Sequence, residues 1–227
     1  MHIGNRLEAI GRLVPRYATV ADIGTDHAYL PVWLIKNGII HHAIAADIAA
    51  GPCAAAKSTV SQYGLQLLID IRQGNGLSVL EPGEVANVIL AGMGAATMIE
   101  ILEANPKVVN CLNNLILQPM TGANLLRTWS QKMGFMISAE NLSKESGRFY
   151  VALVIKPNKK AHTVLTPLEL EIGPCLLRHR PKLLHEYAKS LLQHYRYQLE
   201  QMCQSKEGKI SIKYQQIDKL CHELEVL

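Results

Sequence analysis

Short apolar runs alternate with segments of helical spacing through the first 160 residues of the chain. Such runs are typical of strands that are buried on both faces of a sheet. The expected strands are 19–23, 42–47, 67–72, 86–90, 114–119, 135–141 and a last, antiparallel one at 148–156. The expected helices between them are 28–37, 51–63, 122–133 and the segment that ends near Glu103. This alternation predicts an α/β fold with a doubly wound, Rossmann-like sheet and not a barrel.

The N-terminal segment has the spacing of an amphipathic helix. Its apolar residues follow one another at intervals of four, three and four: Ile3, Leu7, Ile10 and Val14. This spacing places them on one helix face. The arginines of the segment lie off that face: Arg6, Arg12 and Arg16. Two interpretations stay open for them, a solvated surface or a basic rim that contacts phosphate.

The composition changes after residue 160, and the pattern predicts a second, helical domain over 161–227. Apolar residues recur at nearly heptad spacing from Leu184 to Met202 and again from Ile210 to Leu224. The short segment Ser205–Gly208 separates the two patterns. A short loop between two such helices predicts an antiparallel, coiled-coil-like hairpin that follows the sheet domain.

The composition is that of an ordinary globular protein. The chain has 227 residues, of which 48% are hydrophobic and 19% are charged, and its formal net charge is +4. A mildly basic chain is compatible with a polyanionic partner but does not require one. No apolar run is long enough to span a bilayer and no leader-like segment is recognised, so a soluble, cytoplasmic protein without a membrane partner is expected. The oligomeric state is left open, and a monomer is compatible with the pattern.

The cysteines predict neither a disulfide framework nor a metal site. Their number is odd, and they form no Cys-x-x-Cys pair and no metal-type Cys/His spacing. They are expected to be reduced and mostly packed in the interior. They are Cys53, Cys111, Cys175, Cys203 and Cys221.

The segment from Thr19 to Pro31 carries the strongest indication of a binding site. It begins as an apolar strand, turns at Gly24 and continues as a helix. In an open α/β sheet, such a junction presents backbone N–H groups and the positive end of a helix at the carboxyl edge of the strands, where ligands bind. We therefore expect Asp22, Gly24 and Asp26 to hold a nucleoside-type cofactor.

The next strand ends supply the other expected cofactor contacts. Asp47 follows Gly24 by about two dozen residues, the spacing at which a carboxylate binds ribose hydroxyls. Ile48 comes directly after it. Asn75 and Gly76 form a turn after the third strand. The fourth strand ends in a small-residue segment that leaves room for a ligand: Ala91, Gly92 and Met93.

The turn at Gly24 favours S-adenosylmethionine over a dinucleotide. The second and third glycines of the Gly-x-Gly-x-x-Gly fingerprint are absent, which argues against a pyrophosphate at this turn. Asp22 and Asp26 would repel two phosphates, whereas they would attract the sulfonium and ammonium groups of S-adenosylmethionine. An NAD-dependent oxidoreductase is therefore disfavoured.

Four segments together resemble a known family. They are Asp22–Pro31, Gly74–Leu77, Ala91–Gly94 and Leu117–Met120. With a helical arm after the sheet, they are similar to the bacterial tRNA (adenine-22-N1) methyltransferase family, TrmK, and the resemblance covers essentially the whole chain. It implies a class I S-adenosylmethionine-dependent methyltransferase domain over 1–160 and a helical arm over 161–227.

Two positions depart from the family pattern. Asn75 stands where the family has the aspartate of a Gly-Asp-Gly turn. Ala95 follows Gly94 where a further glycine is usual. An asparagine can still hydrogen-bond the adenine of the cofactor. The methyl group of Ala95 is expected to lie near the pocket and to shift the affinity for the cofactor.

The resemblance implies transfer of the methyl group of S-adenosylmethionine to N1 of adenine 22 in the D-arm region of tRNA. Because N1 is a ring nitrogen with a lone pair, catalysis mainly requires alignment and exclusion of water. The methylated ring gains positive charge, so Asp26 is the first candidate for a catalytic carboxylate. Binding of the cofactor ammonium group and capping of the next helix are its alternative roles.

Three further residues are candidates for the site. Tyr29 is a candidate to stack on a displaced adenine, with a place in the core or rim as the alternative. The amide of Gln118 is a candidate to recognise the adenine edge. His27 is expected to form hydrogen bonds at the helix start beside the cofactor and not to act as a base.

The helical arm has an almost balanced charge. Residues 161–227 hold nine Lys and Arg against eight Asp and Glu, a net charge of +1. Such a balance is ordinary for a solvated coiled coil, but the basic cluster from Arg178 to Lys182 and the resemblance favour contact with tRNA over contact with another protomer. A small-molecule methyltransferase with the same cofactor and a non-catalytic RNA-binding protein with the same fold stay open as alternatives.

Overall fold

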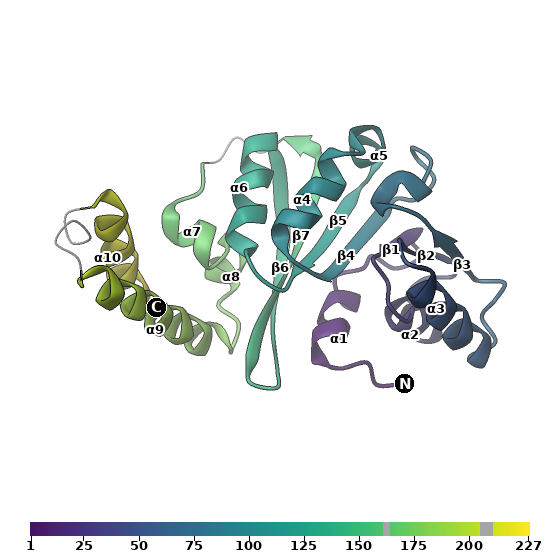
Figure 1. Ribbon diagram of the computed structural model, residues 1–227, viewed down its shortest axis with the longest axis horizontal. Helices are drawn as coiled ribbons and strands as arrows, with labels where there is room; N and C mark the ends of the chain where they lie inside the picture. The colour runs from purple at the N-terminus through teal and green to yellow at the C-terminus, as the bar shows by residue number, and fades with distance from the viewer. Residues whose placement is uncertain (161–163, 205–210) are drawn as a thin grey trace. The chain divides into compact units, whose positions relative to one another are not determined.

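The computed structural model describes residues 1–160, 164–204 and 211–227 (Figure 1). The chain divides into two compact units, Met1–Thr163 and Val164–Leu227, which are described separately.

The first unit is built on one seven-stranded sheet in the order β3-β2-β1-β4-β5-β7-β6. The strands are β1 Val20–Ile23, β2 Ala43–Asp47, β3 Ile69–Gln73, β4 Asn87–Met93, β5 Asn114–Pro119, β6 Phe135–Glu145 and β7 Arg148–Lys160. The first five pair in parallel, and β7 lies antiparallel between β5 and β6. The order reverses on either side of β1, which confirms the expected doubly wound, Rossmann-like sheet.

The register of the central strands sets the position of the binding edge. All four residues of β1 are buried, as expected for a parallel strand that is covered on both faces. Ile23, at the end of β1, lies opposite Ala46 of β2 and Leu90 of β4. The residues that follow these three positions therefore meet at the same edge of the sheet.

The helices of the first unit form two groups. They are α1 Asn5–Gly11, α2 Tyr29–Lys36, α3 Ala50–Gln62, the 3₁₀ helix η1 Gly76–Val79, α4 Ala95–Glu103, α5 Pro106–Cys111 and α6 Ala123–Met133. α2 contacts α1 and α3, whereas α4 contacts α5 and α6 (Figure 1). α5 was not expected from the sequence, because its six residues are too few to show a helical period.

The N-terminal helix packs against the sheet through the face that its spacing predicts. Ile10 and Val14 are buried in one cluster with Val20 and Ile89 from the central strands. Ile3 and Leu7 pack against the edge of the same cluster. α1 is thus part of the hydrophobic core and is fixed with respect to β1 and β4.

Two strands are longer than their apolar runs. β4 extends through Met93, with an irregular register between Ala91 and Met93. β6 extends to Glu145 and pairs with β7 up to a two-residue turn, Ser146-Gly147. Both turn residues have positive φ, 50° and 80°, as in the turns that match the twist of a β-hairpin. The apolar pattern underestimates β4 because its last residues are small and partly exposed, and it underestimates β6 because its end is mostly polar.

The second unit is helical throughout its described elements. These are α7 Pro167–Glu171, α8 Pro174–His179, α9 Leu184–Met202 and α10 Ile212–Glu225. Cys203, just after α9, lies 3.7 Å from the hydroxyl group of Tyr214 near the start of α10. Arg196 of α9 forms an ion pair with Glu225 at the end of α10. α9 and α10 are therefore antiparallel, which confirms the expected hairpin.

The seam between the two long helices follows the heptad pattern in the described part. Ile217, Cys221 and Leu224 of α10 are buried, as are Leu184 and Ala188 of α9. The expected loop 205–208 and the first seam position, 210, lie outside the described residues.

The described residues form no membrane-spanning helix, no metal-binding group and no disulfide. No helix there is both long and apolar enough to cross a membrane. The part of the chain that the structure describes also holds no group of His, Cys, Asp and Glu side chains suited to a metal ion. No disulfide links the five cysteines, all of which are described.

Candidate functional site

Two cavities adjoin at the carboxyl ends of β1 and β4. The strand-tip cavity, of about 500 Å³, lies toward β2 and β3, and the polar cavity, of about 370 Å³, lies toward α1. They share three lining residues, Gly24, Ala91 and Gly92. An elongated ligand that crosses these small residues would occupy both cavities.

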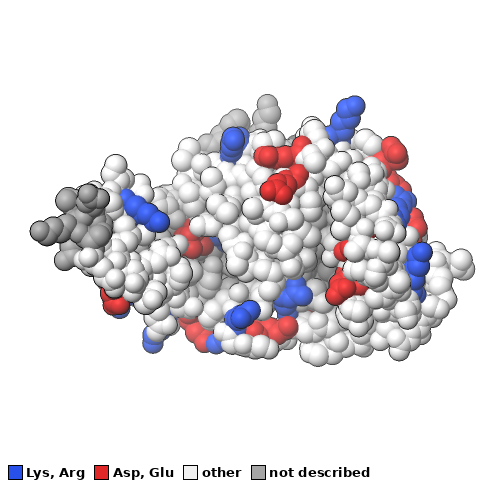
Figure 2. Space-filling model, viewed as in Figure 1, with Lys and Arg blue, Asp and Glu red and all other residues white. Residues whose placement is uncertain are grey.

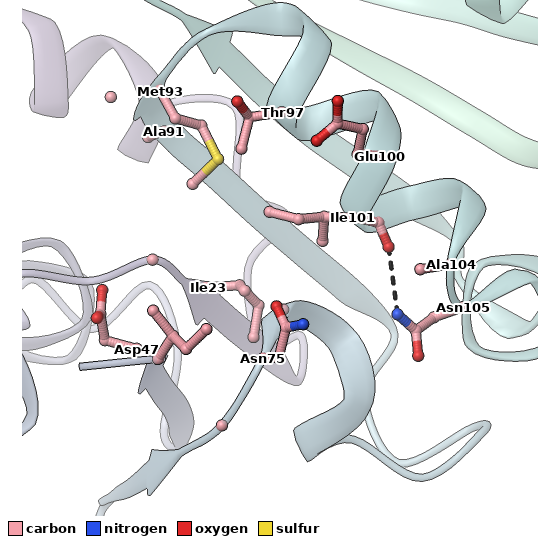
Figure 3. A pocket seen from close by; sticks show the side chains of 15 residues that line it. Ile23, Asp47, Asn75, Ala91, Met93, Thr97, Glu100, Ile101, Ala104 and Asn105 are labelled. Atoms are coloured by element: carbon pink, nitrogen blue, oxygen red, sulfur yellow. Dashed lines mark hydrogen bonds between the residues drawn. The ribbon is translucent and has the colours of Figure 1, made fainter. Parts of the chain in front are cut away.

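The strand-tip cavity is formed by successive strand ends on one side and by α4 on the other. Figure 3 shows Ile23, Asp47 and Asn75 across the opening from Met93 and Ile101. The remaining lining residues are Gly24, Ile48, Gly74, Gly76, Ala91, Gly92, Thr97, Glu100, Ala104 and Asn105. The lining is mostly small or apolar, with few polar groups, as is usual for a pocket that holds a nucleoside.

Asp47 presents a carboxylate at the tip of β2. Its Oδ1 accepts a hydrogen bond from the backbone N–H of Ala49 at 2.8 Å. This bond fixes the carboxylate, and the other oxygen has no partner among the described residues. Ile48 is 63% exposed beside it, and Asn75 adds an amide group to the same cavity. These groups are suited to ribose hydroxyls and to a purine base.

The turn at residue 24 requires glycine for two reasons. Gly24 has a φ of +80°, a conformation that other residues rarely adopt. A Cβ atom at this position would lie 2.6 Å from Cε of Met93. The missing side chain leaves the passage between the two cavities open.

The polar cavity is lined by ionisable groups. Asp22, Asp26, His27 and Tyr29 come from β1 and the segment up to α2, and Arg6 comes from α1. Its other lining residues are Leu7, Gly24, Thr25, Leu30, Ala91 and Gly92. Both positive and negative charges thus face a small space beside the turn at Gly24.

Asp22 is a buried carboxyl group. Burial raises its pKa from the ordinary value of 3.8 to about 6, although a hydrogen bond from Thr25 and the charge of Arg6 both act to lower it. At neutral pH the group is therefore ionised in an environment that disfavours the charge. A cation placed in the polar cavity would be attracted to it.

Asp26 and its neighbours form the exposed rim of the polar cavity. Oδ2 of Asp26 lies 3.4 Å from Nε2 of His27. The rings of His27 and Tyr29 are stacked, with centroids 5.1 Å apart and an interplanar angle of 13°. Asp26 does not cap α2 in the alternative role considered above, because no side chain accepts a capping hydrogen bond at the start of this fully described helix.

Gln118 lies behind this cavity and lines neither space. It is almost fully buried, its Oε1 accepts a hydrogen bond from Nη1 of Arg6 at 2.7 Å, and its Nε2 donates to the carbonyl of Pro119 at 2.8 Å. The amide is thus engaged within the protein. Contact of Gln118 with an adenine edge stays a prediction, and the geometry connects this residue to Arg6.

The structure brings the cofactor residues predicted from the sequence together around the two cavities. Every one of them lines a cavity: Asp22, Gly24, Asp26, His27, Asp47, Ile48, Asn75, Gly76, Ala91, Gly92 and Met93. Their individual roles stay predictions. Ala95, the second departure from the family pattern, is buried and is not among the lining residues.

Two groups of lining residues are not predicted by the sequence pattern. Thr97, Ile101 and Ala104 lie on one face of α4 and the residue after it, at spacings of four and three, directly after the Ala91–Gly94 turn. That spacing was a usable signal. For Arg6 the sequence leaves a solvated surface and a basic rim open, and no local pattern distinguishes it from the other arginines of its segment.

The donors of the two cavities fit S-adenosylmethionine. The strand-tip cavity offers a carboxylate and an amide for an adenosine, and the polar cavity offers carboxylates and a guanidinium group for a zwitterionic amino acid. The acidic side chains that line the two cavities would repel the two phosphates of a dinucleotide.

Comparisons with known proteins identify a family that matches almost the whole chain. The model of a family described as tRNA (adenine(22)-N(1))-methyltransferase, TrmK, matches residues 20–225. A tRNA (adenine(22)-N(1))-methyltransferase of Bacillus subtilis is 31% identical over 230 positions, which cover 100% of this chain and 96% of that protein.

Two solved structures extend the similarity to the whole fold. A Streptococcus pneumoniae protein in complex with S-adenosyl-L-methionine is 32% identical, with a TM-score of 0.82 and coverage of 96% of this chain and 98% of that one. M. capricolum TrmK in complex with S-adenosyl-homocysteine is 27% identical, with a TM-score of 0.80 and coverage of 100% and 96%.

Proposed function

The chain belongs to the tRNA (adenine(22)-N(1))-methyltransferase family, and on this premise we propose that it transfers a methyl group from S-adenosyl-L-methionine to N1 of adenine 22 in tRNA. The observation that carries the proposal is the pair of adjoining cavities across Gly24, Ala91 and Gly92. One suits a nucleoside, and the other suits a charged amino acid beside an open rim.

The residues of the strand-tip cavity hold the nucleoside end of the cofactor. Asp47 accepts hydrogen bonds from the ribose hydroxyls, and Ile48 and Asn75 contact the adenine. Asp22 attracts the ammonium group in the polar cavity. When bound, the cofactor supplies an electrophilic methyl group at a sulfonium centre.

The rim of the polar cavity receives the acceptor base. Methylation at N1 requires the adenine to leave its pair and its stack, and an aromatic side chain can replace the lost stacking. Tyr29 is 43% exposed at the rim, and the ring of His27 covers one of its faces. The two rings form a platform that holds the adenine in line with the methyl group.

Asp26 stabilises the positive charge that develops on the adenine ring. Its side chain is 76% exposed at the rim, whereas Asp22 is buried at the cofactor side of the same cavity. The two carboxylates thus have different neighbours and different roles. A carboxylate next to a developing cation lowers the barrier without proton transfer.

Residues 1–160 form the catalytic domain and residues 161–227 form an arm that binds tRNA. Arg178, Arg180 and Lys182 are exposed close together in sequence, at the end of α8 and just before α9. None of the three forms an ion pair with a described residue. Over the visible face, basic and acidic side chains are interspersed (Figure 2), so a local basic cluster is the more useful guide to a phosphate contact.

Two triple variants that each remove three positive charges test whether the arm binds tRNA. Replacement of Arg178, Arg180 and Lys182 by Ala is expected to weaken tRNA binding about tenfold or more and to reduce the salt dependence of binding, with cofactor affinity unchanged. The control replaces three exposed lysines of the first unit by Ala: Lys57, Lys107 and Lys132. Deletion of 161–227 is expected to abolish tRNA binding and to leave cofactor binding. Unchanged tRNA affinity in both arm variants would refute the assignment.

Nucleoside mass spectrometry tests the reaction itself. The protein is incubated with methyl-labelled S-adenosyl-L-methionine and an unmodified tRNA transcript that has adenine at position 22. Labelled N1-methyladenosine is expected from this transcript and not from a transcript with guanine at that position. Absence of the labelled nucleoside from every tRNA tested would overturn the proposed function.

A further inference from the structure

The hairpin of β6 and β7 projects beyond the rest of the sheet at the edge that holds the two cavities. β7 pairs with β5 only as far as Leu153, which lies opposite Leu117. β6 and β7 stay paired for five further positions, up to Glu145 opposite Arg148. Because β5 has only two residues after Leu117, the last three pairs extend about 10 Å past its carboxyl end. The hairpin tip, residues 143–150, thus lies on the ligand-binding side of the sheet (Figure 1).

The start of α1 holds the hairpin tip in place. Nδ2 of Asn5 donates a hydrogen bond to the carbonyl of Lys144 at 3.2 Å. The backbone N–H of Arg6 donates to Oε2 of Glu145 at 3.0 Å, which supplies a partner that the first turn of α1 lacks within its own helix. A Cβ atom at Gly4 would lie 2.6 Å from the same oxygen, so the chain packs closely there. Because Arg6 also lines the polar cavity, the tip is fixed beside that cavity.

The hairpin tip has two faces, and Arg148 lies on the face that contacts α1. Residues directly opposite each other in an antiparallel pair share a face, as do alternate residues along a strand. Glu145, Arg148 and Tyr150 therefore share one face. Glu145 binds the start of α1, and the ring centroid of Tyr150 lies 5.9 Å from the guanidinium carbon of Arg6. This face is thus the one directed toward α1 and the polar cavity.

Arg148 is an exposed cation that forms no contact with its neighbours. No described residue forms a hydrogen bond or an ion pair with its side chain. Glu145, which lies opposite it, accepts the backbone N–H of Arg6 instead. The other cation of the tip, Lys144, lies on the opposite face, with Nζ 5.0 Å from the ring centroid of Phe149. A guanidinium group with five available N–H donors on a fixed support is suited to a phosphate group.

We propose that Arg148 binds a phosphate of the RNA strand next to the target adenine, and that the hairpin tip presents it for this contact. This assignment rests on the proposed function, because it takes tRNA as the substrate. An adenine that leaves its stack to reach the polar cavity brings its flanking phosphates to the rim of that cavity. A cation fixed beside the rim positions the strand without selecting among bases. The contact belongs to the first unit and is separate from the basic cluster of the arm.

Binding of a tRNA transcript at several salt concentrations, followed by fluorescence anisotropy, tests the assignment on the full chain. Arg148→Gln is expected to weaken binding about three- to tenfold and to lower the slope of log affinity against log salt by about one. Arg148→Lys keeps the charge and is expected to stay within about twofold of the unmodified protein. Calorimetry with S-adenosylhomocysteine checks that the variants are folded, and its affinity is expected to be unchanged.

The opposite face of the same tip provides the matched control. Lys144→Gln also removes one positive charge, and it is expected to change tRNA affinity less than about twofold. Equal losses in Arg148→Gln and Lys144→Gln would show a diffuse effect of charge and would overturn the assignment. Unchanged tRNA affinity in Arg148→Gln would overturn it as well.

Steady-state kinetics separate this assignment from the proposed function. Arg148→Gln is expected to raise KM for tRNA by the same factor as it weakens binding, with kcat within about twofold, because the phosphate contact is present before and during methyl transfer. An unmodified protein that binds tRNA but does not methylate adenine 22 would refute the proposed function and leave the comparison of affinities intact. An unmodified protein that methylates adenine 22, with unchanged KM in Arg148→Gln, would refute only the role of Arg148.

Discussion

The strand-tip cavity and the polar cavity adjoin each other but have different origins. The first is made by successive strand ends and by the helix that follows β4. The second takes acidic and aromatic groups from one segment and a cation from α1, whose anchors Gln118 and Glu145 are 112 and 139 positions away. One cavity thus follows from local chain topology, and the other depends on distant contacts.

The two cavities also differ in what they require of the fold. Few of the residues that line the strand-tip cavity are charged, so its walls pack like those of an ordinary apolar pocket. The polar cavity holds a buried carboxyl group whose pKa is raised to about 6. The difference indicates that the groups around the nucleoside end lower the free energy of unfolding little. The buried charge at the amino-acid and acceptor end lowers it more.

The largest expected effect separates chemistry from binding within the polar cavity. Asp26→Asn keeps the size of the side chain and removes its charge. Turnover is expected to fall by about two to three orders of magnitude, as for the loss of one electrostatic contact to a transition state. Affinity for S-adenosylhomocysteine, measured by calorimetry, is expected to stay within about threefold. A parallel loss of both quantities would assign Asp26 to the cofactor instead.

The free energy of unfolding tests whether the buried carboxyl group of Asp22 destabilises the fold. The folded-state pKa of Asp22 is raised from 3.8 to about 6, so its ionisation destabilises the folded state as pH rises between these values. Asp22→Asn is expected to increase the free energy of unfolding by up to about 3 kcal/mol above pH 7 and to change it little near pH 4. Urea unfolding at both pH values provides the comparison. An equal effect at the two pH values would contradict the assigned cause.

The nucleoside end is tested by a change that affects all adenosine ligands. Asp47→Ala removes the expected partner of the ribose hydroxyls. Affinity is expected to fall about 10- to 30-fold for both S-adenosylhomocysteine and 5′-methylthioadenosine, because both carry the ribose. Calorimetry with the two ligands checks this equality. A loss confined to S-adenosylhomocysteine would place Asp47 at the amino-acid end.

The smallest expected effect concerns the passage between the cavities. Gly24→Ala places a methyl group there at a positive φ, and Gly64→Ala provides the matched control, with a φ of +69° and no atom within 4 Å of the added Cβ. Both variants are expected to lose about 1 kcal/mol of stability from backbone strain. Only Gly24→Ala is expected to lose cofactor affinity, by about fivefold. Equal affinities in the two variants would show that the passage tolerates a side chain.

The sequence predicts the strand-tip cavity better than the polar cavity. The apolar runs predict the strands well, and the turns after β1, β2, β3 and β4 identify residues of the strand-tip cavity, because these features depend on local chain order. The sequence leaves Arg6 open between a solvated surface and a basic rim, and it indicates Gln118 separately as a candidate to recognise the adenine edge. Their hydrogen bond is not predictable from local spacing, because it depends on how α1 packs against the sheet.

A crystal structure of the protein with S-adenosylhomocysteine tests the central claim most directly. The division into two cavities predicts the adenosine between Asn75 and Asp47 and the amino-acid end across Gly24, in the polar cavity beside Asp22. An adenosine in the polar cavity, or an amino-acid end outside that cavity, would contradict the account.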